Sequence, residues 1–221
     1  MYRLSQFGFA SASGRMSVVE ILLSGVCLIS MGWAGEEETT KFNRVLKLGA
    51  EAPVWEGLLE TGGSKLGLVD FKEQRAVVLF FTRNHCPMTG KYAQRIRDLS
   101  REFSDQGVVF VGVNGSRKPD VDLQSMQKTR ERLGWEFPYL KDPSGELASK
   151  YGATVTPQFF LIDGSRRVVY MGALDDHPDV KKVQEPYLRW GIEQVLAGKE
   201  VEIAESLPLG CQIEEEESEK D

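Results

Sequence analysis

Six consecutive apolar residues, 76–81, constrain the fold of this chain more than any other stretch. A run of this length and composition is typical of a strand buried on both faces, as in the interior of a parallel or mixed sheet. A short polar turn follows, and apolar residues then recur every three or four positions from Met88 to Phe103. That period predicts a helix with one apolar face, which Gly107 is placed to end.

Cys86 falls between the predicted strand and the predicted helix, and Pro87 suits the first helical position, where a missing N–H costs nothing. At a helix N-terminus, free backbone N–H groups and the helix dipole stabilise a thiolate and lower the cysteine pKa below its usual ~8.5. Cys86 is therefore the candidate nucleophile. His85 beside it could stabilise the thiolate or relay a proton, because imidazole titrates near neutral pH, or it could simply be a solvated rim residue.

The rest of the chain alternates between strand and helix patterns. A second apolar run at 108–113 follows the first predicted helix, and strand–helix–strand with two buried strands implies a right-handed parallel crossover. Amphipathic patterns at 121–133 and 187–197 predict further helices, and the apolar run 159–162 with its turn at 163–165 predicts a hairpin. This order predicts an α/β domain.

The strand, turn and helix around Cys86 resemble the active-site region of the thioredoxin superfamily, where an aromatic strand end leads into Cys-x-x-Cys. Thr89 occupies the position of the second cysteine, so the site has a single thiol. Pro87 after the cysteine resembles the AhpC/TSA peroxiredoxin site. That pattern also has Thr or Ser three residues before the cysteine and Pro seven before it, and here those positions are Arg83 and Leu79.

A closer resemblance is to a peroxiredoxin-like branch of thioredoxin-fold proteins with Asn-His-Cys-Pro at the site and a Gly-Cys-x-Ile element near the end. It covers residues 48–213, with Gly-Cys-Gln-Ile at 210–213. The resemblance implies a thioredoxin-like fold, a central mixed β-sheet flanked by helices in a single domain. It also implies that Pro157 is cis and faces Cys86, so that the backbone of Thr156 is aimed at a bound substrate. The alternative is an ordinary proline at the start of a strand.

Arg3 and Arg15 precede a moderately apolar segment, 21–31, which ends near Ala34. This pattern is typical of a secretory signal peptide, and it predicts an exported protein, periplasmic or extracytoplasmic, cleaved after Ala34. The alternative is an uncleaved membrane anchor, although the apolar run is too short to span a bilayer unaided. The predicted organisation is a signal peptide at 1–34, a charged linker at 35–47, a thioredoxin-like domain at 48–213 and an acidic disordered tail at 214–221.

Composition argues against two classes of ligand. The net charge is −6 and there is no basic stripe of the kind that nucleic acid requires. His85, Cys86 and Met88 are too close in sequence to point at one ion, and no partner cluster occurs elsewhere, so no metal and no cofactor are expected.

The sequence therefore predicts a thiol-dependent oxidoreductase of the peroxiredoxin-like type, with antioxidant activity. Cys86 would attack a peroxide oxygen or a disulfide sulfur. Because Thr89 has no sulfur, the oxidised state must be resolved by Cys211, the only other cysteine outside the signal segment, or by an external thiol reductant. The alternatives are a thiol–disulfide exchange protein of the thioredoxin type and a non-catalytic binding module on the same scaffold.

Overall fold

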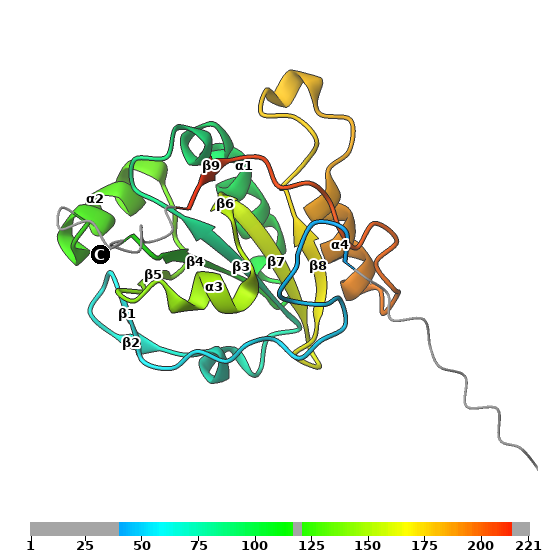
Figure 1. Ribbon diagram of the computed structural model, residues 1–221, viewed down its shortest axis with the longest axis horizontal. Coiled ribbons are helices and arrows are strands. Elements are labelled where there is room, and N and C mark those ends of the chain that lie inside the picture. The colour runs from blue at the N-terminus through cyan, green and yellow to red at the C-terminus, as the bar shows by residue number, and fades with distance from the viewer. Residues whose placement is uncertain (1–39, 117–120, 214–221) are drawn as a thin grey trace, which may run out of the picture. The chain divides into compact units, whose positions relative to one another are not determined.

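Strand β3 (Ala76–Thr82) lies in the interior of a seven-stranded mixed sheet, as its composition predicts. The computed structural model describes residues 40–116 and 121–213, and the strand order is β2-β1-β5-β4-β3-β7-β8 (Figure 1). β3 pairs in parallel with β4 (Val108–Asn114) and antiparallel with β7 (Gln158–Asp163). The expected parallel crossover and the expected hairpin are both present.

Short strands and four α-helices complete the part of the domain that the structure describes. The remaining strands are β1 (Leu58–Glu60), β2 (Lys65–Leu66), β5 (Tyr139–Lys141), β6 (Val155–Thr156), β8 (Val168–Gly172) and β9 (Cys211–Gln212). The α-helices are α1 (Pro87–Ser104), α2 (Leu123–Leu133), α3 (Glu146–Tyr151) and α4 (Tyr187–Leu196). Single 3₁₀ turns occur at Leu68–Phe71 and Val180–Lys182. β6 and β9 form a separate two-stranded sheet.

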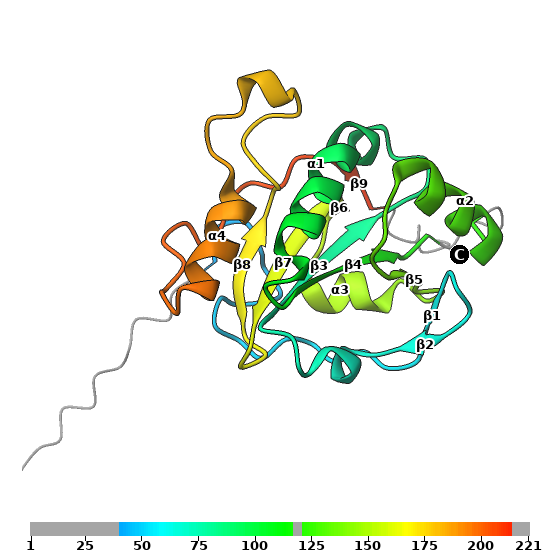
Figure 2. The same ribbon diagram turned by 180° about the vertical axis from the view of Figure 1, so that it is seen from behind.

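The central sheet is covered on both faces, which explains why β3 is apolar throughout. Even-numbered residues from Ala76 to Phe80 enter the core formed with α1, α2 and α4. Odd-numbered residues from Val77 to Phe81 enter the other core, formed with α3 and the first 3₁₀ turn. Figure 2 shows α1 and α4 in front of the sheet with α3 behind it. The period-2 alternation of a strand thus supplies two cores at once.

Helix α1 buries the predicted apolar face but ends earlier than predicted. Tyr92, Ile96 and Phe103 are buried, whereas Met88 in the first turn is only partly buried. The helix stops at Ser104. Gly107 instead forms the turn into β4 with φ +82°, a conformation that glycine adopts without a steric penalty.

The prediction of a charged linker at 35–47 is wrong for its described part, residues 40–47, which packs against the domain. Asn43 is buried and donates from Nδ2 to the Tyr151 carbonyl at 2.8 Å. The Glu205 carboxylate accepts the backbone N–H groups of residues 41–43 at 2.6, 2.8 and 3.1 Å. A charged stretch is expected to be solvated unless a distant part of the chain binds it. Here Glu205, about 160 residues away in sequence, binds it.

The predicted signal peptide, 1–34, and the predicted acidic tail, 214–221, lie outside the described residues. Within 40–116 and 121–213, no helix is both long and apolar enough to cross a membrane.

Replacing Glu205 by alanine tests the attachment of residues 40–47. The change leaves three backbone donors without their carboxylate, and we expect a loss of about 1–3 kcal/mol in the free energy of unfolding, measured in urea. Glu200→Ala is the matched control, because Glu200 is exposed and makes no hydrogen bond to another described residue. Equal stability of the two variants would contradict this attachment.

Candidate active site

Cys86 is the N-cap residue of α1. Its backbone is extended (φ −77°, ψ 114°), Pro87 follows as the first helical residue, and Cys86 Sγ accepts from the Thr89 N–H at 3.4 Å. The side chain is 5% exposed. The expected position at a strand end and a helix start is therefore what the structure has, and the sulfur takes the place of the oxygen that usually caps a helix.

The second cysteine lies directly beside the first. Cys211 Sγ is 3.1 Å from Cys86 Sγ, although the two residues are 125 positions apart in sequence. Both are free thiols, and the separation exceeds the ~2.05 Å of a disulfide bond. Cys211 is brought there by β9, which pairs antiparallel with β6 so that Cys211 faces Thr156 (Figure 1).

Thr156 contacts both cysteines. Its carbonyl accepts from the Cys86 thiol at 3.1 Å, and its hydroxyl donates to the Cys211 carbonyl at 3.4 Å. The Thr156–Pro157 peptide bond is cis, and both residues are buried. The backbone of Thr156 is thus aimed at the sulfur of Cys86.

The two thiols differ in acidity. Burial alone would raise the pKa of the Cys86 thiol, but its hydrogen bonds with Thr156, Thr89 and Cys211 together outweigh burial and lower the pKa to about 7. Burial and the neighbouring Cys86 both raise the pKa of Cys211. As the pH rises through 7, Cys86 therefore ionises before Cys211, whose thiol can donate to the Cys86 thiolate.

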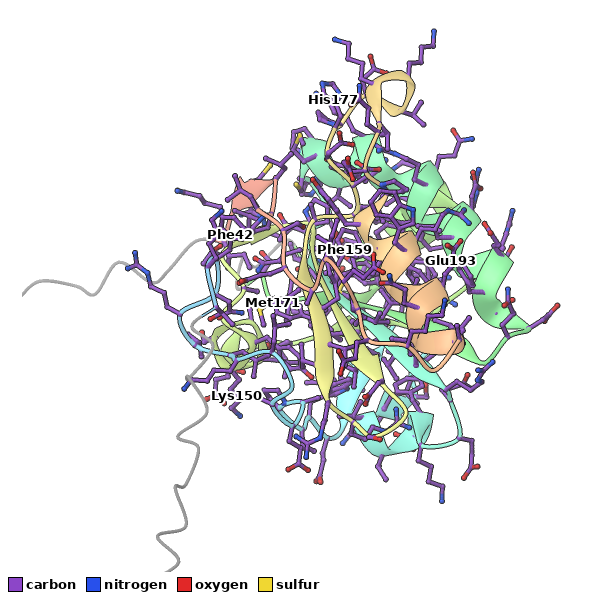
Figure 3. The ribbon with its side chains drawn as sticks, turned by 90° about the vertical axis from the view of Figure 1, so that its right-hand side faces the viewer. Phe42, Lys150, Phe159, Met171, His177 and Glu193 are labelled. Atoms are coloured by element: carbon purple, nitrogen blue, oxygen red, sulfur yellow. The ribbon has the colours of Figure 1, made fainter. Side chains whose placement is uncertain are left out.

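Of the other predicted site residues, Thr89 contacts the cysteine pair and His85 does not. Thr89 is buried, and besides its N–H contact with Cys86 its hydroxyl bonds the hydroxyl of Thr82 at 3.0 Å. His85 is exposed and makes no hydrogen bond to another described residue, so no direct link joins it to the Cys86 sulfur. The structure therefore brings together Cys86, Thr89, Thr156, Pro157 and Cys211, and leaves His85 at the rim. His177 lies on the loop before α4 that projects from the domain (Figure 3).

A buried amide network beside the cysteine was missed from the sequence. Asn84 Oδ1 accepts from Asn114 Nδ2 at 3.1 Å and from the Tyr139 hydroxyl at 2.9 Å, and Asn84 Nδ2 donates to Ser125 Oγ at 3.2 Å. This network ties the loop before Cys86 to β4, β5 and α2. The signal was available, since Asn84 and Asn114 follow two apolar runs whose carboxyl ends meet in a parallel pair.

Gln158 was also missed. It is buried on β7, and its Oε1 accepts from the Thr154 N–H at 2.9 Å and the Val155 N–H at 3.4 Å. It therefore holds the backbone at the start of β6. No metal-binding group of three or more His, Cys, Asp or Glu side chains occurs among the residues that the structure describes.

Comparison with solved structures defines the class of fold. A hypothetical protein from Sinorhizobium meliloti 1021 matches with a TM-score of 0.71 and 33% identity, over 77% of this chain and 96% of that chain. The thioredoxin domain of a thiol-disulfide oxidoreductase from Bacteroides vulgatus matches with a TM-score of 0.51 and 21% identity, over 57% and 88%. The fold is thioredoxin-like.

The family follows from sequence comparison. A model of the AhpC/TSA family matches residues 48–171, and the chain belongs to that family. A putative peroxiredoxin of Mycobacterium tuberculosis is 30% identical over 121 residues, 55% of this chain and 73% of the relative. A thiol-disulfide oxidoreductase, ResA, of Bacillus cereus is 25% identical over 154 residues, 69% and 82%. The chain therefore falls among thiol-based redox proteins of the thioredoxin type.

The acidity of the two thiols can be measured by alkylation with iodoacetamide. We expect the rate at the Cys86 peptide to rise through pH 7 and level off above it, because only the thiolate reacts. Cys211 in the same sample is the internal control, and it should react only at higher pH. Cys211→Ala removes one donor and should move the Cys86 pKa upward. An apparent pKa of Cys86 at or above ~8.5 would refute this description of the site.

Proposed function

We propose that this protein is a thiol-dependent oxidoreductase that reduces peroxides with Cys86 as nucleophile and Cys211 as resolving thiol. The observation that carries the proposal is the 3.1 Å separation of the two sulfur atoms, with the more acidic one at the helix N-terminus. Membership of the AhpC/TSA family and similarity to a putative peroxiredoxin support the choice of oxidant.

The proposed cycle balances in three steps. The Cys86 thiolate attacks one peroxide oxygen, the O–O bond breaks, the departing alkoxide or hydroxide takes a proton, and Cys86 becomes a sulfenic acid. Cys211 then attacks the Cys86 sulfur, releasing water and forming a Cys86–Cys211 disulfide. Two equivalents of an external thiol reduce this disulfide by exchange and are themselves oxidised to a disulfide.

The site favours these steps for physical reasons. The Thr89 N–H and the Cys211 S–H stabilise the attacking thiolate, and no part of Cys211 has to travel far to reach the oxidised sulfur. Thr89 itself cannot resolve the sulfenic acid, because it has no thiol. Since Cys86 is 5% exposed, a small peroxide reaches it more easily than a bulky oxidant does while β9 is in place.

Thiol–disulfide exchange is the second candidate. The observation that favours it is the β6–β9 pairing, in which a cysteine on an extended strand faces Thr156 beside the Cys86 sulfur. A disulfide substrate would give a mixed disulfide with Cys86 in place of the sulfenic acid, and Cys211 would resolve it in the same way.

Peptide mapping without reductant tests the pairing. After one equivalent of hydrogen peroxide, the reduced protein should yield a linked Cys86–Cys211 peptide. Cys86→Ser should consume no peroxide beyond the uncatalysed rate. Cys211→Ser, the matched cysteine variant, should keep the first step and accumulate a Cys86 sulfenic acid that dimedone traps. A persistent sulfenic acid beside a free Cys211 thiol in the unmutated protein would exclude the resolving role. If neither peroxide nor a disulfide oxidises Cys86, a non-catalytic binding module remains.

We further propose that the protein is exported and that residues 1–34 are removed. The support is the basic start, the apolar segment 21–31 and the small residue Ala34 at its end. N-terminal sequencing of exported protein should begin near Gly35. Exported protein that retains residues 21–31 would show an uncleaved anchor instead.

A further inference from the structure

The turn that delivers Cys86 has one buried and one exposed central residue. The Cys86 N–H donates to the Arg83 carbonyl at 3.3 Å, which closes a turn whose central residues are Asn84 and His85. His85 is exposed, whereas Asn84 is only 6% exposed. The position of the turn, and with it the backbone of Cys86, is therefore coupled to the groups that the Asn84 side chain meets inside the protein.

The Asn84 amide is bonded through both its oxygen and its nitrogen. Oδ1 accepts from Asn114 Nδ2 at 3.1 Å and from the Tyr139 hydroxyl at 2.9 Å, and Nδ2 donates to Ser125 Oγ at 3.2 Å. Asn114 and Tyr139 are fully buried, so water cannot replace Asn84 as their acceptor. Ser125 on α2 is only partly buried, and its hydroxyl can turn to water. The oxygen is therefore the stronger anchor of the turn.

The sulfur that the turn carries has to meet groups on three different elements. Cys86 Sγ accepts from the Thr89 N–H of α1 at 3.4 Å and donates to the Thr156 carbonyl of β6 at 3.1 Å. On β9, Cys211 Sγ lies 3.1 Å away. Each of these contacts depends on direction as well as on distance. A shift of the turn by about 1 Å would weaken all three, and a misplacement of that size can cost about 10²-fold in rate.

We propose that Asn84 is a positioning residue for the reaction of Cys86, and that its amide sets the rate of the chemical step by holding the sulfur in line with the bond that breaks. This inference rests on the proposed function of Cys86 as nucleophile. In the peroxide reaction the S–O bond forms as the O–O bond breaks, and the departing oxygen takes a proton. Alignment governs this step, whereas ionisation of the thiol makes no such demand. Loss of Asn84 therefore lowers the rate even where Cys86 is fully ionised.

The experiment compares two reagents on the full chain. Quenched flow and mass spectrometry of the Cys86 peptide give the rate of thiol loss with hydrogen peroxide and, separately, with iodoacetamide, from about pH 5 to about pH 10. Both reagents need the thiolate, so both rates level off above the Cys86 pKa. Iodide leaves without a proton, so alkylation needs only an accessible thiolate, whereas the departing peroxide oxygen must also lie beside a proton donor fixed in the site.

Asn84→Leu keeps the size of the side chain and removes its three hydrogen bonds. We expect the limiting peroxide rate to fall about 10- to 100-fold and the limiting alkylation rate to change less than about threefold. Asn43→Leu is the matched control, because Asn43 is also buried and makes three hydrogen bonds, to the Tyr151 carbonyl and to the N–H groups of residues 45 and 46. It should lose stability in urea but react with peroxide at the unmutated rate.

Asn84→Asp is the conservative variant. A carboxyl group keeps both acceptor positions for Asn114 and Tyr139, and the Ser125 hydroxyl can turn to donate to it. A negative charge here would repel the thiolate and move the Cys86 pKa upward, but above that pKa the limiting peroxide rate should return to within about threefold of the unmutated value. A retained plateau separates the alignment of the sulfur from its charge.

Tyr139→Phe keeps the inference testable if Asn84→Leu does not fold. It removes one of the two donors to Asn84 Oδ1 and leaves Asn114 in place. We expect a loss of about three- to tenfold in the limiting peroxide rate, whereas Ser125→Ala, on the weaker side of the amide, should change it less than about twofold.

The outcomes distinguish this inference from the proposed function. If the unmutated protein reacts with peroxide and the folded Asn84 and Tyr139 variants match its limiting rate, Asn84 is not a positioning residue. Equal loss of the peroxide and alkylation rates would mean a covered sulfur, and equal loss in Asn43→Leu would mean general destabilisation; either result overturns the inference. If Cys86 of the unmutated protein is alkylated but peroxide never oxidises it, the proposed peroxide reduction is itself wrong.

Discussion

The burial of β3 on both faces is the constraint on which the site depends. Alternate side chains of β3 enter two different cores, so its interior has no room for a polar or reactive side chain. Chemistry can therefore begin only where the strand ends, in the turn that leads to α1. Cys86 stands at that turn, and the same geometry that ends the strand supplies the unpaired N–H groups of a helix start.

The loop that carries Cys86 is held by buried polar contacts. The amide of Asn84 meets partners on β4, β5 and α2, and Asn114 and Tyr139 are both fully buried. A buried amide without partners would be costly, so this network allows only a narrow set of positions for the loop. The sulfur of Cys86 is thereby placed against Thr156 with little freedom to move away.

The difference between the two cysteines comes from their surroundings, since their chemistry is the same. Cys86 caps a helix, where donors converge on the sulfur and lower its pKa. Cys211 lies on a short edge strand, where burial and the neighbouring sulfur raise its pKa. The difference in pKa favours Cys86 as the nucleophile, because the more acidic thiol ionises first while Cys211 keeps its proton and can donate it in a hydrogen bond.

Local sequence determined the parts of this protein that depend on neighbours in the chain. The apolar run of β3, the helical period of α1 and Pro87 after Cys86 were sufficient to predict a strand, a helix and a thiol between them. Resemblance to known families extended this to the thioredoxin-like fold. These features depend on periodicity and on single-residue preferences, which are visible in any window of the sequence.

Only the tertiary structure decided the contacts between distant segments. The approach of Cys211 to Cys86, the carboxylate of Glu205 on residues 41–43, and the amide pair of Asn84 and Asn114 join positions 30 to 164 residues apart. No local pattern encodes such pairs, because each segment alone is compatible with solvent. The charged stretch 40–47 looked like a linker for this reason. What fixes these pairs is the requirement that each buried donor or acceptor finds a partner once the sheet and helices are packed.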